Sequence, residues 1–319
     1  MKAELLIQNG NKVYIPVVEE GITWSTERKG SPGQLTFSVV KDDLINFTEG
    51  NAVRLRIDDK NIFYGFVFIK KCNKDKIINV TAYDQLRYLK NKDTYVYTNK
   101  TAGEFIQMIA SDFNMNTGTL ENTGYKIASR VEDNVALMDM IQNALDLTLQ
   151  NKREMFVMFD DFGKITLKNI QSMRLNLLID EETGENYSYT SSIDSDTYNR
   201  IKLIYDNEKS GKRDVYIAQD SNNINNWGVL QYFDTLKKGE NGKAKADALL
   251  SLYNKKTRNL TINNALGDTR VRAGSMVVVQ LNLGDIKLNN LMLVEKCKHK
   301  FNHDEHLMDL TLRGGEFVA

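Results

Sequence analysis

The sequence predicts a mainly β protein of the α+β class, in which a small α/β module is inserted between two β-barrel-like domains. Two observations predict this: apolar and polar residues alternate at both ends of the chain, and the periodicity is helical between them. The 319 residues are enough for two or three domains. We expect an N-terminal β domain over 1–97, the module over 98–190 and a C-terminal β domain over 191–319.

The N-terminal domain is predicted to begin with a hairpin, because Asn9-Gly10-Asn11 is a strong turn signal between two alternating segments. The segment Gly50–Asn91 then predicts three antiparallel strands joined by short polar turns. Its middle strand, 62–69, is apolar on both faces, so both faces need cover. A closed barrel or a second subunit would provide that cover. Gly65 inside this strand indicates a bend, a bulge or a close backbone approach.

Aromatic residues of the middle strand are our candidates for a subunit interface. They are Phe63, Tyr64, Phe66 and Phe68. Such rings can also stack on bases or sugars, but their position beside Val67 and Ile69 favours a core or an interface.

The inserted module is predicted to contain two helices followed by a hairpin. Thr101 and Glu104 have the spacing of a capping box in front of the first helix. The second helix is expected to start near Asp133. Two strands then flank Asp161-Phe162-Gly163, whose Asp and Gly suit a hairpin turn.

The C-terminal domain is predicted to be β-rich with one helix. Alternation over 201–217 predicts a hairpin, and an amphipathic pattern predicts the helix over 243–257. The last strands are expected at 277–279, 291–301 and 306–312.

The three histidines of the chain are the candidate metal ligands. A hairpin turn at 302–305 would bring His299 close to His306, diagonally across the two strands. His303 with a neighbouring carboxylate could then complete a set of nitrogen and oxygen ligands. The helical HExxH spacing is absent, and the pattern fits a polar turn between two core-facing strands. We therefore expect no metal site.

The rest of the sequence contains no motif that is typical of a catalytic or cofactor-binding site. There is no nucleophile elbow, no cysteine in a catalytic context and no phosphate-binding loop at a workable spacing. We therefore expect no catalytic residue and no cofactor, and we predict that the protein is not an enzyme.

Charge and hydropathy limit the partners and the compartment. Forty-two basic and 42 acidic residues balance, which argues against general electrostatic binding of nucleic acid. Apolar runs are too short for a secretion signal or for a membrane span, which needs about 18 residues. Cys72 and Cys297 lie far apart in the sequence, and we expect reduced thiols in a cytoplasm. We predict no specific nucleic acid partner and no membrane anchor.

Several short pieces, in this order and spacing, resemble one protein family. They are Ile22-Thr23-Trp24, Gly50-Asn51-Ala52-Val53, Val80 to Asp84, Phe156 to Leu167, Asn199-Arg200-Ile201, Gly274 to Val278 and His306 to Leu312. Together they resemble the baseplate hub proteins of contractile phage tails, and most closely the hub of PBSX-like prophages. That family is related to phage late-control and type VI spike-hub proteins.

The resemblance implies a structural role in a tail machine. Hubs of this family are trimers whose β-barrel-like domains form a six-domain torus, an adaptor between the six-fold tail tube and the three-fold spike. The implied partners are the spike, tail tube or distal tail proteins, the tape measure protein and baseplate wedge proteins. The protein would be made in the cytoplasm of a bacterial host and end in the baseplate of a virion or tail-like particle.

Two alternative functions stay open beside the hub. One is a receptor- or carbohydrate-binding baseplate module, which would present an exposed aromatic groove. The other is a metal-dependent cell-wall hydrolase, which would need the three histidines to converge. The parent particle could be an infectious phage, a tail-like bacteriocin or a defective prophage.

Overall fold

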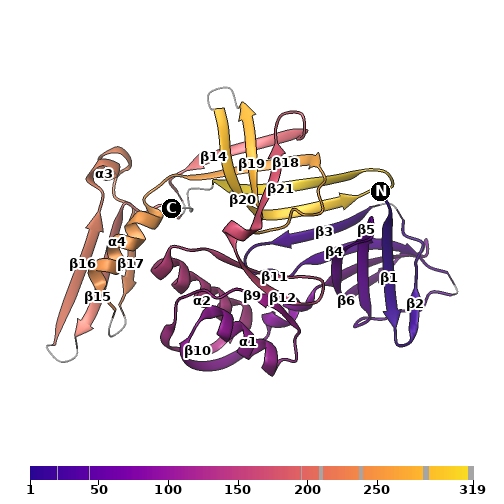
Figure 1. Ribbon diagram of the computed structural model, residues 1–319, viewed down its shortest axis with the longest axis horizontal. Helices are drawn as coiled ribbons and strands as arrows, with labels where there is room; N and C mark the ends of the chain where they lie inside the picture. Colours follow the sequence, from indigo (N-terminus) through magenta and orange to yellow (C-terminus); the bar gives the residue numbers. More distant parts are fainter. Residues whose placement is uncertain are drawn as a thin grey trace.

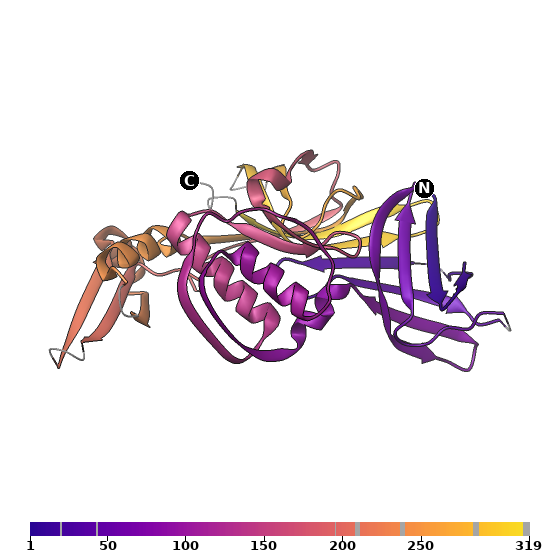
Figure 2. The same ribbon diagram turned by 60° about the horizontal axis from the view of Figure 1, so that its bottom comes forward.

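Four parts make up the protein, and two of them, a small lobe and the N-terminal domain, lie at the two ends of its long axis (Figure 1, Figure 2). The computed structural model describes residues 1–19, 21–42, 44–194, 196–207, 211–236, 240–282 and 287–314. An N-terminal β domain and a C-terminal β domain share one large sheet, a helical module packs beneath it, and a small lobe projects at one end. The predicted α+β, mainly β class is confirmed.

The N-terminal domain contains the first seven strands. Their bounds are β1 (Ala3–Asn9), β2 (Lys12–Tyr14), β3 (Ile22–Glu27), β4 (Gln34–Val40), β5 (Ala52–Ile57), β6 (Lys60–Cys72) and β7 (Ile77–Tyr83). The predicted antiparallel meander is β5-β6-β7. The predicted first hairpin is β1-β2, and Gly10 adopts a positive φ of 57° in its turn. A bridge between Val18 and Val39 extends the pairing of β4 beyond β3, and the buried apolar side chains of these strands form one core.

The helical module follows β7 directly. Its elements are the 3-10 helix η1 (Gln85–Lys90), β8 (Lys92–Lys100), α1 (Ala102–Asp112), β9 (Thr117–Leu120), β10 (Ile127–Ala136), α2 (Leu137–Lys152), β11 (Phe156–Asp160), β12 (Ile165–Asn169) and the 3-10 helix η2 (Ile170–Met173). Both halves of the predicted capping box form, since the Thr101 hydroxyl accepts from the Glu104 N–H and the Glu104 carboxylate from the Thr101 N–H. The predicted turn at Asp161-Phe162-Gly163 joins β11 to β12, with positive φ at Phe162 and Gly163.

The C-terminal domain is built from strands that are far apart in the chain. They are β13 (Arg174–Ile179), β14 (Asn186–Ser192), β18 (Thr257–Leu266), β19 (Met276–Asn282), β20 (Lys287–Phe301) and β21 (His306–Gly314). The long strand β20 pairs with β21 on one side and with β3 of the N-terminal domain on the other. The β3-β20 pairing therefore fuses the two β domains into one sheet of 13 strands.

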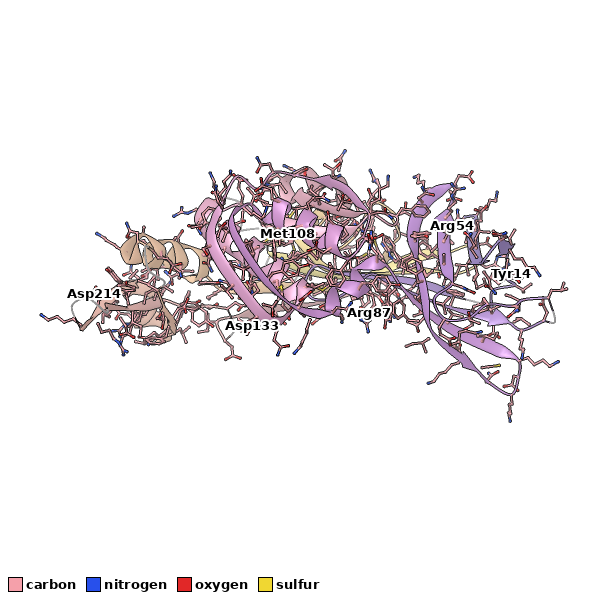
Figure 3. All side chains as sticks on the ribbon, turned by 90° about the horizontal axis from the view of Figure 1, so that it is seen from below. Tyr14, Arg54, Arg87, Met108, Asp133 and Asp214 are labelled. Carbon is pink, nitrogen blue, oxygen red and sulfur yellow. The ribbon has the colours of Figure 1, made fainter. Side chains whose placement is uncertain are left out.

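The projecting lobe lies between β14 and β18 in the sequence. It contains β15 (Arg200–Asn207), β16 (Lys212–Gln219), the short helix α3 (Ser221–Trp227), β17 (Gln231–Thr235) and α4 (Gly242–Tyr253). Its three strands form a separate sheet, and α4 packs on one face of that sheet over a core of its own. Asp214 of the lobe and Tyr14 of the first hairpin lie at opposite ends of the molecule (Figure 3).

The structure divides the chain at other positions than those predicted. The N-terminal domain expected over 1–97 ends with β7 at Tyr83, because β8 pairs with β10 of the module. The module expected over 98–190 ends at Met173, because β13 and β14 pair with β19 and β18 of the large sheet. The domain expected over 191–319 contains the lobe as a separate unit, with α3 in addition to the predicted helix. Local periodicity could not reveal these differences, since they depend on which strands pair with one another.

Candidate interaction surface

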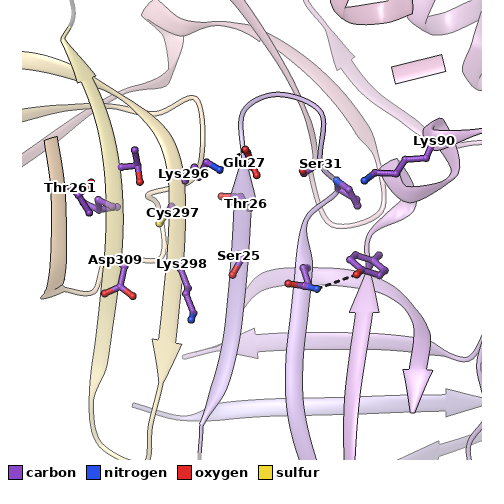
Figure 4. Close-up of a pocket in the computed structure, with 15 residues that line it drawn as sticks. Ser25, Thr26, Glu27, Ser31, Lys90, Thr261, Lys296, Cys297, Lys298 and Asp309 are labelled. Atoms are coloured by element: carbon purple, nitrogen blue, oxygen red, sulfur yellow. Dashed lines mark hydrogen bonds and ion pairs between the residues drawn. The ribbon is translucent and has the colours of Figure 1, made fainter. Parts of the chain in front are cut away.

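A polar groove crosses the seam between the two β domains (Figure 4). Its volume is about 440 Å³, and strands β21, β20, β3, β4 and β7 supply most of its lining. The side chains that line it are mainly hydroxyls, amides and lysines, among them Ser25, Ser31, Gln34, Tyr83, Lys90, Thr261, Lys296, Lys298, Asp309 and Thr311. The Gln34 amide donates to the Tyr83 hydroxyl across β4 and β7, 3.2 Å apart.

Strand β20 carries a lysine at every second position from 296 to 300, and Lys296 and Lys298 line the groove. Lys296 forms an ion pair with Glu27, with 2.7 Å between Nζ and Oε1, and Lys300 forms one with Asp309 at 2.7 Å. Lys298 lies between these two pairs, and Lys90 extends from the end of η1 on the opposite side of the groove (Figure 4). Within the described residues, the side chains of Lys90 and Lys298 have no ionic or hydrogen-bonding partner. The groove therefore carries two uncompensated positive charges.

An aromatic cluster continues the groove along β6. Tyr83 belongs to both features, because its ring meets Phe68 edge-on with 5.4 Å between centroids. From Phe68 the contacts run to Tyr88 at 5.9 Å and from Tyr88 to Phe66 at 6.0 Å. The Arg87 guanidinium lies 5.5 Å from the centre of the Phe68 ring. Figure 3 shows Arg87 between the module and the N-terminal strands.

The four interface candidates occupy two different environments. Phe63 is 3% exposed and packs in the core of its own domain, so its ring is not at the surface. Tyr64, Phe66 and Phe68 lie half-buried on the other face of β6. The module covers part of that face, since Phe162 contacts Tyr64 with 5.8 Å between ring centroids. The strand with two apolar faces is thus covered partly within the chain, and an interface through the three outer rings stays a prediction.

The histidines are only partly brought together. The predicted proximity of His299 and His306 is present, with 2.8 Å between Nδ1 of His299 and Nε2 of His306. His303 lies on the turn with its side chain 96% exposed. No group of three His, Cys, Asp or Glu residues suited to a metal occurs in the described part of the chain.

The hydrogen bonds of His299 determine how the histidine pair is protonated. Its Nε2 lies 2.8 Å from the carbonyl oxygen of Val271, which can only accept, so Nε2 carries the hydrogen. Nδ1 is then the acceptor, and His306 donates to it from Nε2. Burial lowers the pKa of His299 to about 4 and also lowers the pKa of His306. Both ring nitrogens of His299 are therefore committed to hydrogen bonds inside the protein.

A buried acidic cluster joins the three larger parts of the protein. Asp84, at the end of β7, accepts from the Gly33 and Leu86 backbone N–H groups. Asp160 of the module accepts from the Gly163 N–H and from the Gln85 side chain. Burial is the main cause that raises the pKa of both carboxyl groups, and their mutual repulsion raises that of Asp84 further. Hydrogen bonds to these carboxylates connect segments from different parts of the protein, as in a structural junction.

Arg272 links the C-terminal domain to this junction. Its Nη2 donates to the backbone carbonyl of Asp160 at 2.7 Å, and its guanidinium lies 4.0 Å from the centre of the Phe159 ring. Our sequence analysis singled out neither the acidic cluster nor the two uncompensated lysines. For the lysines, the signal in the sequence was the alternation of Lys296, Lys298 and Lys300 along one strand.

Hydropathy adds one further finding. In the described ranges, no helix combines the length and the apolar character that crossing a membrane requires.

Comparison with known proteins identifies the fold and the family. The structure resembles the 43 kDa tail protein of prophage MuSo2 from Shewanella oneidensis, with a TM-score of 0.73, 11% identity and coverage of 99% of this chain and 100% of that one. Prophage tail protein gp18 from Listeria monocytogenes matches with a TM-score of 0.66 and 10% identity, over 97% of this chain and 94% of that one. The type VI secretion component c3393 of E. coli matches with a TM-score of 0.57 and 10% identity, over 97% of this chain and 76% of that one.

Sequence relatives cover nearly the whole chain. The phage-like element PBSX protein XkdQ and the uncharacterized protein YqbQ, both from Bacillus subtilis, are each 29% identical over 94% of this chain and 93% of their own length. The resemblance to a PBSX protein and to tail and type VI proteins is thereby confirmed. Because the YQBQ-like family profile matches residues 22–313, the chain belongs to the YQBQ-like family and has the fold of phage tail proteins.

Proposed function

We propose that this protein is the structural baseplate hub of a contractile phage tail or phage tail-like particle. In this role it is a trimeric adaptor between the six-fold tail tube and the three-fold spike. The observation that carries the proposal is the pairing of β3 with β20, which holds two β domains in one continuous sheet. Three copies of such a chain present six β domains around one axis, which matches both symmetries. The relative from the PBSX element and the tail-protein fold support the same role.

The proposed hub has partners on several sides. The spike, tail tube or distal tail proteins, the tape measure protein and the wedge proteins are the expected neighbours. A cyclic trimer uses a heterologous contact that closes after three steps. We place Tyr64, Phe66 and Phe68 at or beside that contact, because these half-buried rings have apolar area left to bury. The protein is made in the cytoplasm of a bacterial host and then enters the baseplate.

Light scattering of the protein alone and with its spike tests the proposal. We expect a 3:3 complex built on a ring of three 36.5 kDa chains once the spike is present. The Phe66→Ser/Phe68→Ser variant should weaken the ring, whereas Lys12→Ser, at the exposed end of the molecule, should not. A 1:1 complex at assembly concentrations would reject the hub.

A receptor- or carbohydrate-binding baseplate module is the second candidate function. The observation in its favour is the aromatic cluster beside a polar groove, with Tyr88 37% exposed. Saturable binding of a host cell-wall polysaccharide, lost in Tyr88→Ala, would favour it over the hub. For a metal-dependent hydrolase, the hydrogen bonds that occupy both ring nitrogens of His299 leave neither nitrogen of that ring free to bind a metal. We expect no release of fragments from peptidoglycan in a turnover assay.

A further inference from the structure

We propose that the groove across the β3-β20 seam binds an acidic, extended segment of a partner protein. Carboxylates of that segment would meet Lys90 and Lys298, and an apolar side chain would rest against Tyr88. The inference goes beyond the proposed function, because it assigns a ligand chemistry to a surface of the single chain. It does not depend on the chain being a trimer.

The charges of the groove identify the ligand as anionic. Glu27 and Asp309 already neutralise Lys296 and Lys300, with nitrogen–oxygen distances of 2.7 Å in both pairs. Lys90 and Lys298 have no such partner in the described part of the chain, although the chain as a whole has a formal net charge of zero. Covering these two ammonium groups with a neutral surface would be costly, since a desolvated charge needs a counter-charge. An occupant with two carboxylates supplies it.

The floor of the groove favours an extended peptide. The strands beneath it are interior strands, whose backbone groups already pair with neighbours on both sides. A partner therefore meets side chains and cannot add a strand to the sheet. The hydroxyls of Ser25, Thr261 and Thr311 both donate and accept, which suits the peptide groups of an extended chain.

The aromatic cluster supplies an apolar contact at one side of the groove. Tyr83 lines the groove and packs against Phe68, which in turn contacts Tyr88. Tyr88 is 37% exposed, so a ring or aliphatic side chain of the partner can still bury part of it. A peptide that carries acidic residues and one apolar residue therefore fits both the lysines and the aromatic rings.

A nucleic acid fits the same surface less well. Its backbone carries one negative charge for each nucleotide, whereas the groove has two uncompensated lysines and also holds Glu27 and Asp309. Because these two carboxylates already pair with Lys296 and Lys300, the groove offers no continuous row of free cations to a row of phosphates. A peptide can avoid them by placing polar residues between its acidic ones.

Fluorescence anisotropy with the isolated chain tests the inference. The probe is a short labelled peptide in which Glu alternates with Ser around one central Phe. We expect saturable binding that weakens with added salt, because the contacts are between exposed charges. Lys90→Glu/Lys298→Glu should weaken it by about tenfold or more, the equivalent of about 1.4 kcal/mol. The matched control Lys12→Glu/Lys74→Glu, with the same charge change on lysines outside the groove, should leave it within about twofold of the wild type.

Two further arms make the result decisive. Tyr88→Ala should weaken binding of the Phe peptide but not of the same peptide with Ser in place of Phe. Absence of saturable binding, or equal loss in the two double variants, overturns the inference. So does tighter binding of an oligothymidine that is lost in Lys90→Glu/Lys298→Glu. Because the assay uses the single chain, its outcome is separate from the light scattering that tests the trimer.

Discussion

His306 donates its Nε2–H to Nδ1 of His299, 2.8 Å away, across the hairpin of β20 and β21. The pair lies beside the seam of the large sheet, because the His299 ring stacks on Trp24 of β3 with 4.9 Å between centroids. The two histidines thus help to join the N-terminal and C-terminal domains. The His299 ring cannot take up a proton at Nδ1 without the loss of this hydrogen bond.

The histidine pair should make folding stability depend on pH. The pKa of His299 is about 4 in the folded protein and about 6.5 in the unfolded chain, so the unfolded chain binds more protons between these values. The free energy of unfolding should therefore fall as the pH is lowered from 7.5 to 5, by roughly 2 kcal/mol from His299 alone. Urea denaturation at a series of pH values measures this loss.

Variants isolate the contribution of His299 from those of other groups. The raised pKa values of Asp84 and Asp160 act in the opposite direction, because there the folded protein binds protons more tightly. His299→Gln should reduce the loss of stability between pH 7.5 and 5, relative to the wild type. The exposed His303→Gln should not change it. An unchanged pH dependence in His299→Gln would show that the ring is protonated in the folded protein.

Gly65 should tolerate no side chain. A Cβ at this position would collide with the backbone carbonyl group of Tyr83 and lie 2.6 Å from Cζ of Phe63. Gly65→Ala should therefore lower the free energy of unfolding by about 3 kcal/mol, as overpacking next to a fixed backbone does. Gly103→Ala is the matched control, since a Cβ in that helical position lies 3.4 Å from its nearest neighbour. It should be neutral or stabilising by up to about 1 kcal/mol. Equal effects of the two substitutions in urea denaturation would contradict the close approach.

Asp84 and Asp160 should respond differently to the same substitution. Both oxygens of Asp84 accept from backbone N–H groups, so Asp84→Asn turns one acceptor into a donor that faces a donor. We expect a loss of about 2 kcal/mol in the free energy of unfolding. In Asp160→Asn, the Gln85 amide can rotate and accept from the new amide group, with the loss of its longer 3.3 Å hydrogen bond to the Asn116 carbonyl, so we expect a smaller loss than in Asp84→Asn. The urea midpoints of the two variants measure both losses of stability. A larger loss in Asp160→Asn than in Asp84→Asn would contradict these hydrogen-bond roles.

The sequence was most informative where a structure is local. The turn at Gly10, the capping box of Thr101 and Glu104, and the meander around Gly65 each depend on residues within a short segment. The seam between β3 and β20 joins strands that are more than 260 residues apart, as the Arg28–Glu295 ion pair beside it shows. The alternation of apolar and polar residues predicts that each of these two segments is a strand, but it does not identify the strand with which each one pairs. The lobe was overlooked for the same reason.

The candidate surface shows the same limit. The periodicity placed the rings of β6 on two faces but could not show that Phe162 of the module covers part of one of them. Lys90 and Lys298 became noticeable only once the fold placed them around one groove without counter-charges. Charge balance over the whole chain hides such a local excess.

The lobe should be removable without unfolding the rest of the protein. The chain enters and leaves it at neighbouring positions, because Ser192 at the end of β14 pairs with Thr257 at the start of β18. Its core is separate from those of the other parts, and its helix α4 contacts the body through α2. Replacing 193–256 by a short Gly-Ser turn should therefore leave one cooperative thermal transition, shifted by only a few degrees.

The matched control is a smaller deletion inside the large sheet. Removing β13 takes away the parallel partner of β19 and Ile179 from a buried core, so that variant should lose its cooperative transition although far fewer residues are missing. Circular dichroism melts and hydrogen exchange of β18 and β21 compare the two variants. If the lobe deletion unfolds the large sheet as the β13 deletion does, the lobe is part of the same cooperative unit and its separate core does not make it independent.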